Sequence, residues 1–215
     1  MNPGKSIKNL RRQYTLNSLS EKIVQKNPFR QFERWFKDVI KLDLPEKNAM
    51  ILATASNKSK PSARVVLLKG ITNQGFKFFT NYKSAKAKDI LETSSASLLF
   101  YWAGLERQIR IEGKIRKLSK TESQKYFYTR PYESRIAAWA SEQSKIIPDR
   151  NFLELRYKKF ETKFSGKKIP LPPNWGGYIL VPDYFEFWQG RENRLHDRIC
   201  YKKLKGEWKI FRLAP

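Results

Sequence analysis

The densest group of side chains that could do chemistry lies near the C-terminus, in residues 188–198. This segment holds three arginines and the only histidine of the 215-residue chain. Alternate residues of a β-strand share a face, so a strand here directs Arg194, His196 and Arg198 to one side. Cationic groups on one face disfavour one another's charge unless an anion lies against them. The pattern predicts part of a pocket for a charged small molecule, and the alternative is a solvated basic strand.

Residues 80–86 form a second candidate site, where a predicted strand ends and a predicted helix begins. The first amides of a helix have no partner within the helix and attract anions. Thr80, Ser84 and Lys86 add hydroxyl and ammonium groups to those amides. The combination favours binding of a phosphate group.

Two further cations flank an apolar run, since Arg64 opens and Lys69 closes the segment 64–69. We expect the apolar part of this strand to be buried, which leaves the two charges near the rim of a sheet. Either the charges contribute to the same anion site or they simply reach water.

A third set of donors surrounds the dipeptide Arg130-Pro131. Tyr126 and Arg130 are four residues apart, which places them on one face of a predicted helix, and Ser134 begins the next segment. A phenol, a guanidinium and a hydroxyl together suit a phosphomonoester. The alternative is a core tyrosine beside a capping serine.

Neutral donors complete the set of candidate residues. Alternation places Gln108 on the polar face of a predicted strand, and Gln143 and Ser144 directly follow a predicted helix. Two phosphate-type sites, these donors and Trp188 beside arginines indicate two phosphorylated ligands. One is expected to be large, aromatic and redox-capable, and the other small.

Composition narrows the class of protein. The net charge of +24 invites a nucleic-acid interpretation, but the basic residues are spread along the chain and no nucleic-acid motif is visible, so such a partner is not expected. A single cysteine, Cys200, excludes an internal disulfide, and with one histidine it leaves no zinc site. The chain shows neither a signal peptide nor an apolar run of membrane-spanning length, which predicts a cytoplasmic protein without membrane contact.

Hydrophobic periodicity predicts an antiparallel α+β fold. We expect residues 1–26 to form a mobile arm, with a short helix at 10–16, and residues 27–215 to form one domain. Neither a G-x-G-x-x-G motif nor a Walker A sequence is present, which excludes the standard dinucleotide and P-loop sites. The expected helices are 28–42, 84–92, 119–128, 134–140 and 149–164, and the expected strands are 49–55, 63–69, 76–80, 96–102, 107–118, 177–181, 184–188, 194–201 and 208–213.

Read in order, these segments resemble the pyridoxine/pyridoxamine 5′-phosphate oxidases, FMN enzymes of the vitamin B6 pathway. The resemblance covers about residues 10–215 and is specific, because no single short motif carries it. The matching segments are 64–70, 107–113, 130–136, 138–141, 175–178, 186–191, 194–198 and 212–215.

The resemblance implies an FMN-binding split β-barrel that acts as a homodimer, with FMN at the subunit interface. It implies oxidation of pyridoxamine or pyridoxine 5′-phosphate to pyridoxal 5′-phosphate, with O2 as acceptor giving H2O2, and ammonia from the amine substrate. The residues at the family's FMN contacts are Arg64, Val65, Val66, Leu67, Leu68, Lys69, Phe79, Thr80, Lys86, Gln108, Gln143, Ser144, Trp188 and Arg198. Those at its substrate contacts are Arg11, Arg12, Gln13, Tyr14, Lys69, Tyr126, Arg130, Ser134, Arg194, Leu195 and His196.

Within these sets, Arg194 and His196 are the candidate catalytic residues, and segment 11–14 is expected to cover the site. Whether His196 binds the ring hydroxyl or assists proton removal stays open. The chain also departs from the family twice. Ala85 stands where the family usually has arginine, which predicts FMN binding weaker by about 1–3 kcal/mol, unless Lys83 or Lys88 compensates. Ala137 stands where the family usually has glycine.

Two other classes of protein remain as alternatives. One is a basic nucleic-acid-binding protein, which would be colourless when purified and would shift duplex DNA at moderate salt. The other is a flavin- or pyridoxal-phosphate-binding split-barrel protein without turnover, which would be yellow but would release no peroxide.

Overall fold

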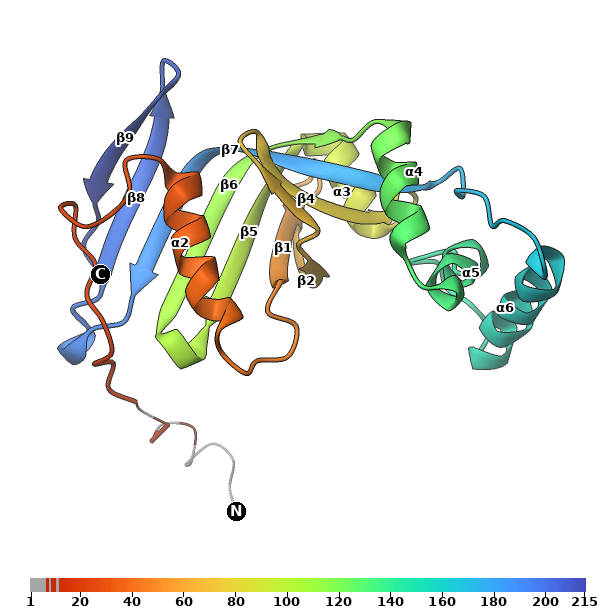
Figure 1. Cartoon of the computed structure of the whole chain (residues 1–215), viewed down its shortest axis with the longest axis horizontal. Helices are drawn as coiled ribbons and strands as arrows, with labels where there is room; N and C mark the ends of the chain where they lie inside the picture. Colours follow the sequence, from red (N-terminus) through yellow and green to blue (C-terminus); the bar gives the residue numbers. More distant parts are fainter. Residues whose placement is uncertain (1–6, 8, 11) are drawn as a thin grey trace. The chain divides into compact units, whose positions relative to one another are not determined.

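The computed structural model describes residues 7, 9, 10 and 12–215 and confirms the predicted antiparallel α+β class (Figure 1). The helices are α2 (Pro28–Ile40), α3 (Ala85–Thr93), α4 (Lys120–Thr129), α5 (Tyr132–Ala140) and α6 (Arg150–Phe164), with 3₁₀ turns η1 (Ala103–Leu105) and η2 (Glu192–Arg194). The strands are β1 (Ala49–Ala55), β2 (Pro61–Leu67), β3 (Gly70–Thr72), β4 (Gly75–Asn81), β5 (Ser95–Trp102), β6 (Arg107–Lys117), β7 (Trp175–Gln189), β8 (Asp197–Leu204) and β9 (Glu207–Arg212). Their order is β2-β1-β5-β6-β7-β4-β3, with β8 pairing β7 and β9 pairing β8.

The chain divides into two compact units. The first unit contains Met1–Lys47, Leu98–Ile111 and Asp183–Pro215, and the second contains Asn48–Ser97 and Glu112–Pro182. Strands β5, β6 and β7 each contribute residues to both units.

In the first unit, helix α2 forms where the sequence predicts it and packs an aromatic face inward. The Asn27 side chain accepts a hydrogen bond from the Phe29 N–H at 2.9 Å, which caps the helix. Phe32 lies edge-on to Phe100, with ring centroids 5.1 Å apart. Trp35 lies edge-on to Phe187 at 5.2 Å. These contacts bury the apolar stripe of the helix against the strands of the unit.

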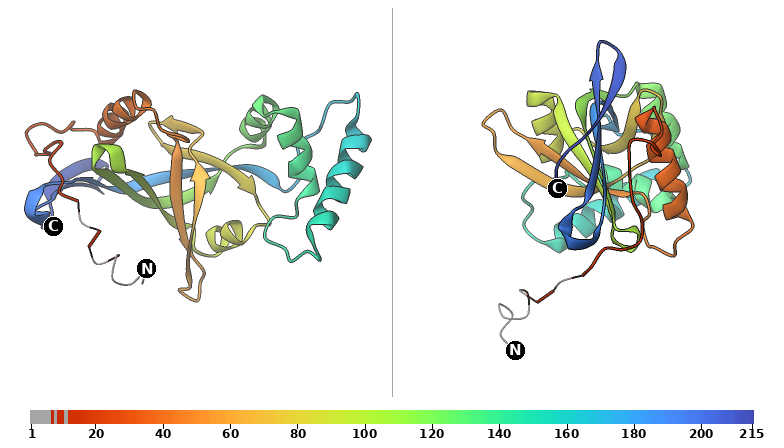
Figure 2. Two further views of the ribbon diagram at one scale, coloured as in Figure 1. Left: turned by 90° about the horizontal axis from the view of Figure 1, so that it is seen from below. Right: turned by 90° about the vertical axis from the view of Figure 1, so that its left-hand side faces the viewer.

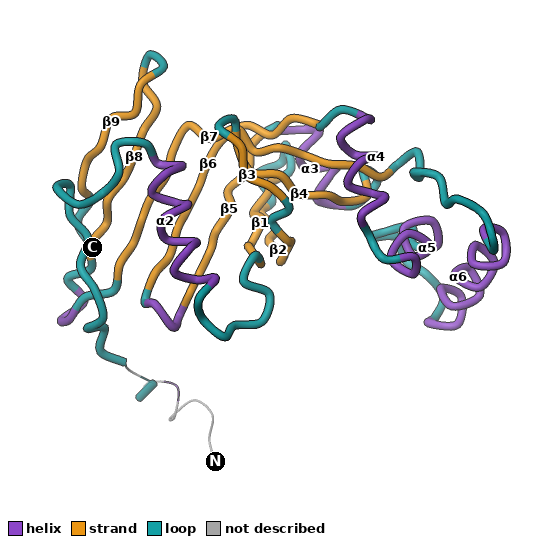
Figure 3. The backbone as a smooth tube through the Cα atoms, viewed as in Figure 1, coloured by secondary structure: helices purple, strands orange, loops and turns teal. Residues whose placement is uncertain are grey.

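The first unit also contains the β8–β9 hairpin, which Figure 3 traces as the last two strands of the chain. Its turn places Lys205 and Gly206 at positive φ, where glycine is the least strained residue. The predicted strand 194–201 begins later than expected, at Asp197. The described residues of the predicted helix 10–16 form no helix.

Strand β7 corrects another expectation, because segments 177–181 and 184–188 belong to one continuous strand. Pro182 lies between the two predicted segments and cannot donate a ladder hydrogen bond. In the structure β7 pairs with β4 through residues 175–180 and with β8 through residues 184–189. The proline therefore falls between the residues that pair with β4 and those that pair with β8.

In the second unit, β1 and β2 form a hairpin with Ala49 opposite Leu67 and Ala55 opposite Pro61. The prediction that segment 64–69 is a buried strand is wrong, because Val65 is 63% exposed. The physical reason is position: β2 is the last strand in the order, and among the described strands it pairs with β1 alone. Helices α5 and α6 lie side by side in the same unit, as both views of Figure 2 show.

Candidate functional site

A cavity of about 910 Å³ opens in the second unit and gathers residues from β2, β4, the start of α3, the α4–α5 junction and the start of β7. The predicted site residues that line it are Arg64, Val65, Val66, Leu67, Lys69, Phe79, Thr80, Lys86, Tyr126, Arg130, Ser134 and Gln143. The lining also includes Ala137, where the sequence departs from the family. The sequence predicted no ligand contact for this residue or for the remaining lining residues, which are Asn81, Thr129, Pro131, Ala138, Ser141 and Trp175.

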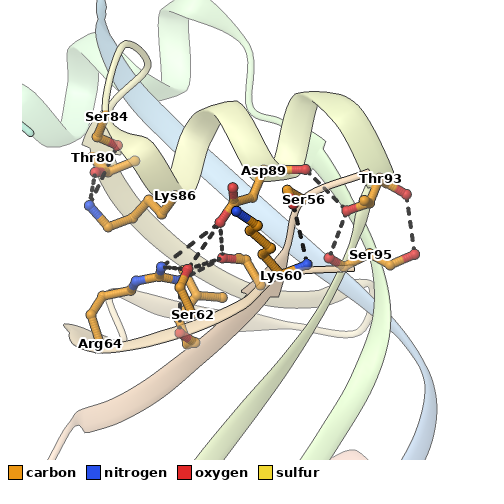
Figure 4. A network of polar contacts seen from close by, with 12 residues as sticks. Ser56, Lys60, Ser62, Arg64, Thr80, Ser84, Lys86, Asp89, Thr93 and Ser95 are labelled. Carbon is orange, nitrogen blue, oxygen red and sulfur yellow. Dashed lines mark hydrogen bonds and ion pairs between the residues drawn. The ribbon is translucent and has the colours of Figure 1, made fainter. Parts of the chain in front are cut away.

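Lys86 projects from the first turn of α3 and is only 9% exposed. Its Nζ lies 3.4 Å from Thr80 Oγ1, 3.3 Å from Gln143 Oε1 and 3.5 Å from Ser84 Oγ, and Figure 4 shows the first and last of these contacts. All three partners are neutral. Burial, followed by the nearby Arg64 charge, lowers the pKa of Lys86. An anion at this point would relieve both effects.

Arg64, in contrast, has a carboxylate beside it. Its Nη1 donates to Thr54 Oγ1 at 2.7 Å and to the Leu52 carbonyl at 3.1 Å, and its Nη2 contacts Ser62 and lies 4.0 Å from Asp89 (Figure 4). Burial lowers the pKa of Arg64, and Asp89 opposes that shift. The same Asp89 carboxylate accepts from Thr54 at 2.6 Å. This network fixes the guanidinium at the edge of the cavity.

Arg130 enters the cavity for a reason the sequence contains. Helical geometry is disfavoured for the residue before a proline, and Arg130 has φ −77° and ψ 148° at the end of α4. Tyr126 and Arg130 therefore do not share a helical face as predicted, although both line the cavity. The guanidinium lies 4.8 Å from the Trp175 ring centre, and its buried Nη1 has no hydrogen-bond partner among the described residues. Burial lowers the pKa of Arg130, and Tyr126 opposes that shift.

Aromatic rings form a wall of the cavity behind these cations. Phe79 stacks on Tyr126 with centroids 3.9 Å apart, and Trp175 stacks on Phe79 at 5.6 Å. Trp175 belongs to the matched segment 175–178, but its role was not predicted. Its signal in the sequence was a tryptophan directly before two glycines.

Two predicted residues of the second unit do not line the cavity. Leu68 is buried in the core, and its N–H donates to the Asn48 carbonyl at 2.8 Å. Ser144 lies in a turn with φ +69°. The cavity lining includes neither Lys83 nor Lys88.

The first unit holds the other predicted residues in a second, smaller cluster. The Trp188 and His196 rings lie 4.6 Å apart. Tyr14 lies edge-on to both rings, with centroids 5.7 Å away in each case. A cavity of about 520 Å³ here is lined by Leu10, Arg12, Gln13, Tyr14, Arg191, Asn193, Arg194 and His196. Arg11 lies outside the described residues, and Leu195 is exposed.

The predicted strand geometry of Arg194, His196 and Arg198 is wrong, because only Arg198 lies in a strand. Arg194 ends the turn η2 with φ +61°, after Asn193 at φ +55°, and the strand starts at Asp197. Arg194 therefore lies in a tight turn at positive φ, and not in a strand whose side chains alternate between two faces. The turn motif Glu192-Asn193 was the available sequence signal, since asparagine tolerates positive φ.

The hydrogen bonding of His196 favours one tautomer of the neutral ring. Its Nδ1 accepts a hydrogen bond from the Arg191 N–H at 3.1 Å, which leaves Nε2 to carry the proton. Burial, followed by the charge of Arg194, lowers the pKa of His196 below its ordinary value. The histidine is therefore arranged to donate a hydrogen bond from Nε2.

Arg198 is held by a buried carboxylate. Glu186, 3% exposed, accepts from Arg198 Nε at 2.9 Å and from Arg110 Nη2 at 2.7 Å. Burial alone would raise the pKa of Glu186, but the hydrogen bonds from Arg198 and Arg110 lower it overall. The predicted Gln108 is half-buried on β6, between the buried residues Arg107 and Ile109.

The described residues limit which ligands these sites can bind. They include no group of three histidine, cysteine, aspartate or glutamate side chains that could hold a metal ion. Cations, hydroxyls and one partnerless guanidinium nitrogen instead suit phosphorylated organic ligands. None of the described helices is long and apolar enough to cross a bilayer.

Fold and cavity together define an antiparallel split-barrel protein built to hold anionic organic ligands. Residues 36–164 match the family described as pyridoxamine 5′-phosphate oxidase, and residues 175–215 match the pyridoxine 5′-phosphate oxidase C-terminal dimerisation region. The chain belongs to the pyridoxine/pyridoxamine 5′-phosphate oxidase family, as the sequence resemblance predicted, and is an enzyme of that family.

Individual relatives agree with this assignment. The chain is 53% identical over 211 residues to a pyridoxine/pyridoxamine 5′-phosphate oxidase from Paraburkholderia phymatum, covering 98% of this chain and 99% of that one. It is 50% identical over 210 residues to the protein of the same name from Cyanothece sp., with the same coverage. The crystal structure of PhzG from Burkholderia lata, in complex with tetrahydrophenazine-1-carboxylic acid, is 30% identical with a TM-score of 0.87 and covers 93% of this chain and 99% of that one. An FMN-binding protein from Nostoc punctiforme shares the fold at 18% identity, with a TM-score of 0.70 over 89% of this chain and all of that one.

Proposed function

We propose that this chain catalyses the FMN-dependent oxidation of pyridoxamine or pyridoxine 5′-phosphate to pyridoxal 5′-phosphate. O2 is the electron acceptor and yields H2O2, and the amine substrate releases ammonia. The observation that carries the proposal is the cavity of the second unit, where Arg130 Nη1 is buried without a hydrogen-bond partner beside Tyr126 and Ser134. An unsatisfied buried cation in a cavity is stabilised by an anionic ligand group.

The residues present fit FMN as the first ligand. Lys86, surrounded by neutral acceptors, and Arg64 would hold its phosphate together with Thr80. When bound, FMN supplies the acceptor for a hydride from the substrate. The protein supplies position and charge. We assign Gln108, Trp188 and Arg198 to the same ligand, with Arg198 stabilising negative charge on the flavin ring system.

A second group of residues is assigned to the substrate. Lys69, Tyr126, Arg130 and Ser134 hold its phosphate and so orient the carbon that reacts. Arg194 and His196 contact the substrate ring, and the Nε2–H of His196 donates to the ring hydroxyl. This tautomer supports a binding role for His196, in preference to proton removal from the substrate.

We also propose a homodimer with FMN at the subunit interface. The match of residues 175–215 to a dimerisation region supports the homodimer. The exposed edge strand β2, with Val65 63% exposed beside the cavity, offers an apolar surface that a second copy would cover.

Anaerobic mixing with pyridoxamine 5′-phosphate tests the proposed reaction. We expect the purified protein to carry a flavin absorbance that bleaches after mixing and returns on admission of O2, with release of H2O2. Pyridoxamine without its phosphate is the matched control and should bleach the flavin far more slowly. A flavin that keeps its absorbance with the phosphorylated substrate overturns the proposal.

A further inference from the structure

Glu106 is a buried carboxylate that the proposed reaction does not use. It follows the turn η1 at φ +55°, and its side chain is 1% exposed. Its backbone carbonyl accepts from the Gly190 N–H at 2.8 Å. A buried acid in a strained backbone conformation persists only where surrounding contacts hold it.

The surroundings of Glu106 are fixed by Gln189, whose side chain is fully buried. Gln189 Nε2 donates to the carbonyls of Leu105 and Glu106, each at 3.2 Å. Its Oε1 accepts from Arg107 Nε at 3.0 Å, and Arg107 forms an ion pair with Asp38 at 2.8 Å. The turn that carries Glu106 is therefore tied to both β7 and α2.

The carboxylate oxygens of Glu106 turn to the N-terminal segment. Oε2 accepts a hydrogen bond from the Leu16 N–H at 3.1 Å, and Oε1 lies 3.4 Å from Arg12 Nη2. Burying a carboxylate is costly unless such partners are present. Docking of residues 12–16 and burial of Glu106 thus stabilise each other.

In the sequence, Tyr14 lies between Arg12 and Leu16, the two residues that the Glu106 carboxylate contacts. Its ring is edge-on to Trp188 at 87° and to His196 at 71°. It also covers Gly190, where an added Cβ would lie 2.7 Å from Tyr14 Cγ. Only a residue without a side chain permits this approach.

We propose that Glu106 is a positioning residue that anchors residues 12–16 and thereby holds Tyr14 against Trp188 and His196. Its effect on catalysis rests on the proposed function, whereas the anchoring itself does not. Loss of the anchor frees Tyr14 from Trp188 and His196 without substituting any residue that we assign to the flavin or to the substrate phosphate.

Limited digestion with chymotrypsin, without substrate, tests the anchor. Cleavage after Tyr14 gives a product that begins at Thr15 and is measured by mass spectrometry. In Glu106→Gln we expect this cleavage to be about 10-fold faster, the effect of losing about 1.4 kcal/mol from a charge-assisted contact. Leu16→Pro removes the donated N–H without touching the buried acid and should have the same effect. Glu207→Gln, an exposed glutamate of the β8–β9 hairpin, is the control and should match the parent protein.

Steady-state kinetics then test the consequence. Both variants should raise KM for pyridoxamine 5′-phosphate several-fold, by about 3–10-fold on the same scale, and leave the flavin absorbance spectrum unchanged. Leu16→Pro with parental cleavage and KM overturns the proposal even if Glu106→Gln fails to fold. If the parent protein does not oxidise the substrate at all, the proposed function fails. The digestion still tests whether Glu106 anchors residues 12–16.

Discussion

Lys86 and Arg130 in the cavity of the second unit are held in the opposite way to Arg198 in the C-terminal cluster of the first unit. In the cavity, Lys86 contacts only neutral acceptors, and Arg130 leaves one buried nitrogen without a partner. In the cluster, Glu186 neutralises Arg198, and Asp197 pairs with Arg191 at 3.6 Å and with Arg212 at 2.7 Å.

The difference separates two uses of a basic residue. A cation already paired with a buried carboxylate is held rigidly and contributes to the folded structure. A buried cation that lacks such a carboxylate raises the free energy of the unliganded state and gains most from an anionic ligand. A carboxylate therefore fixes Arg64 and Arg198 before any ligand binds, whereas Lys86 and Arg130 gain a counter-charge from the ligand.

The largest expected effect is on the free energy of unfolding, when a cation loses its carboxylate partner. Glu186→Gln leaves Arg110 and Arg198 facing each other without their carboxylate, and we expect it to lower the free energy of unfolding by about 3–5 kcal/mol. Urea denaturation measures the change. Glu122→Gln, which removes an exposed partner of Lys77, is the control and should cost less than about 1 kcal/mol. Equal effects for the two variants would show that Glu186 is no buried anchor.

On the unpaired side, Arg130→Met should lower kcat/KM for pyridoxamine 5′-phosphate by about 10–100-fold, through loss of about 1.5–3 kcal/mol of phosphate binding. Turnover of unphosphorylated pyridoxamine should hardly change. Arg135→Met is the matched control, because Arg135 also has a buried nitrogen without a partner but does not line the cavity. A similar loss with both substrates would contradict the phosphate assignment.

Lys86→Met sharpens the same contrast in the absence of substrate. We expect FMN binding to weaken about 10-fold or more, while the unliganded protein keeps or gains stability because a buried charge is removed. Quenching of FMN fluorescence measures the first quantity, and thermal unfolding of the unliganded protein measures the second. Lys88→Met on the exposed face of α3 is the control. If Lys88→Met weakens FMN equally, Lys88 compensates for Ala85 after all.

The smallest expected effect concerns the pKa of His196. Burial, followed by the charge of Arg194, lowers the pKa of His196 in the folded protein below its ordinary value. The ring therefore takes up a proton at a lower pH in the folded protein than in the unfolded chain. Stability linked to this group is present above the unfolded pKa and is lost as the pH falls through the folded pKa. Arg194→Gln should raise the pKa towards 6.5.

An NMR titration measures this pKa without ambiguity, because the chain has a single histidine. Arg191→Gln is the control, since that guanidinium is paired with Asp197 and its backbone N–H remains. A larger shift in the control than in Arg194→Gln would contradict the electrostatic assignment.

The sequence by itself determined the elements and the identity of the chemical groups. Asn27-Pro28 starts α2, Ser119 caps α4 through the Glu122 N–H at 3.1 Å, and Arg130-Pro131 ends α4. These features depend on neighbours within a few residues, which is why local patterns predict them. Ordered motifs along the chain were likewise enough to predict the family.

Only the tertiary structure decided which charges are paired and which are exposed. Asp89, Glu106 and Glu186 give no local signal, because the residues that they hold lie far away in the sequence. The exposure of Val65 depends on the edge position of β2, and the path of β7 through Pro182 depends on a change of partner strand. Burial and pairing are properties of contacts between distant segments, so a periodic pattern in one segment does not contain them.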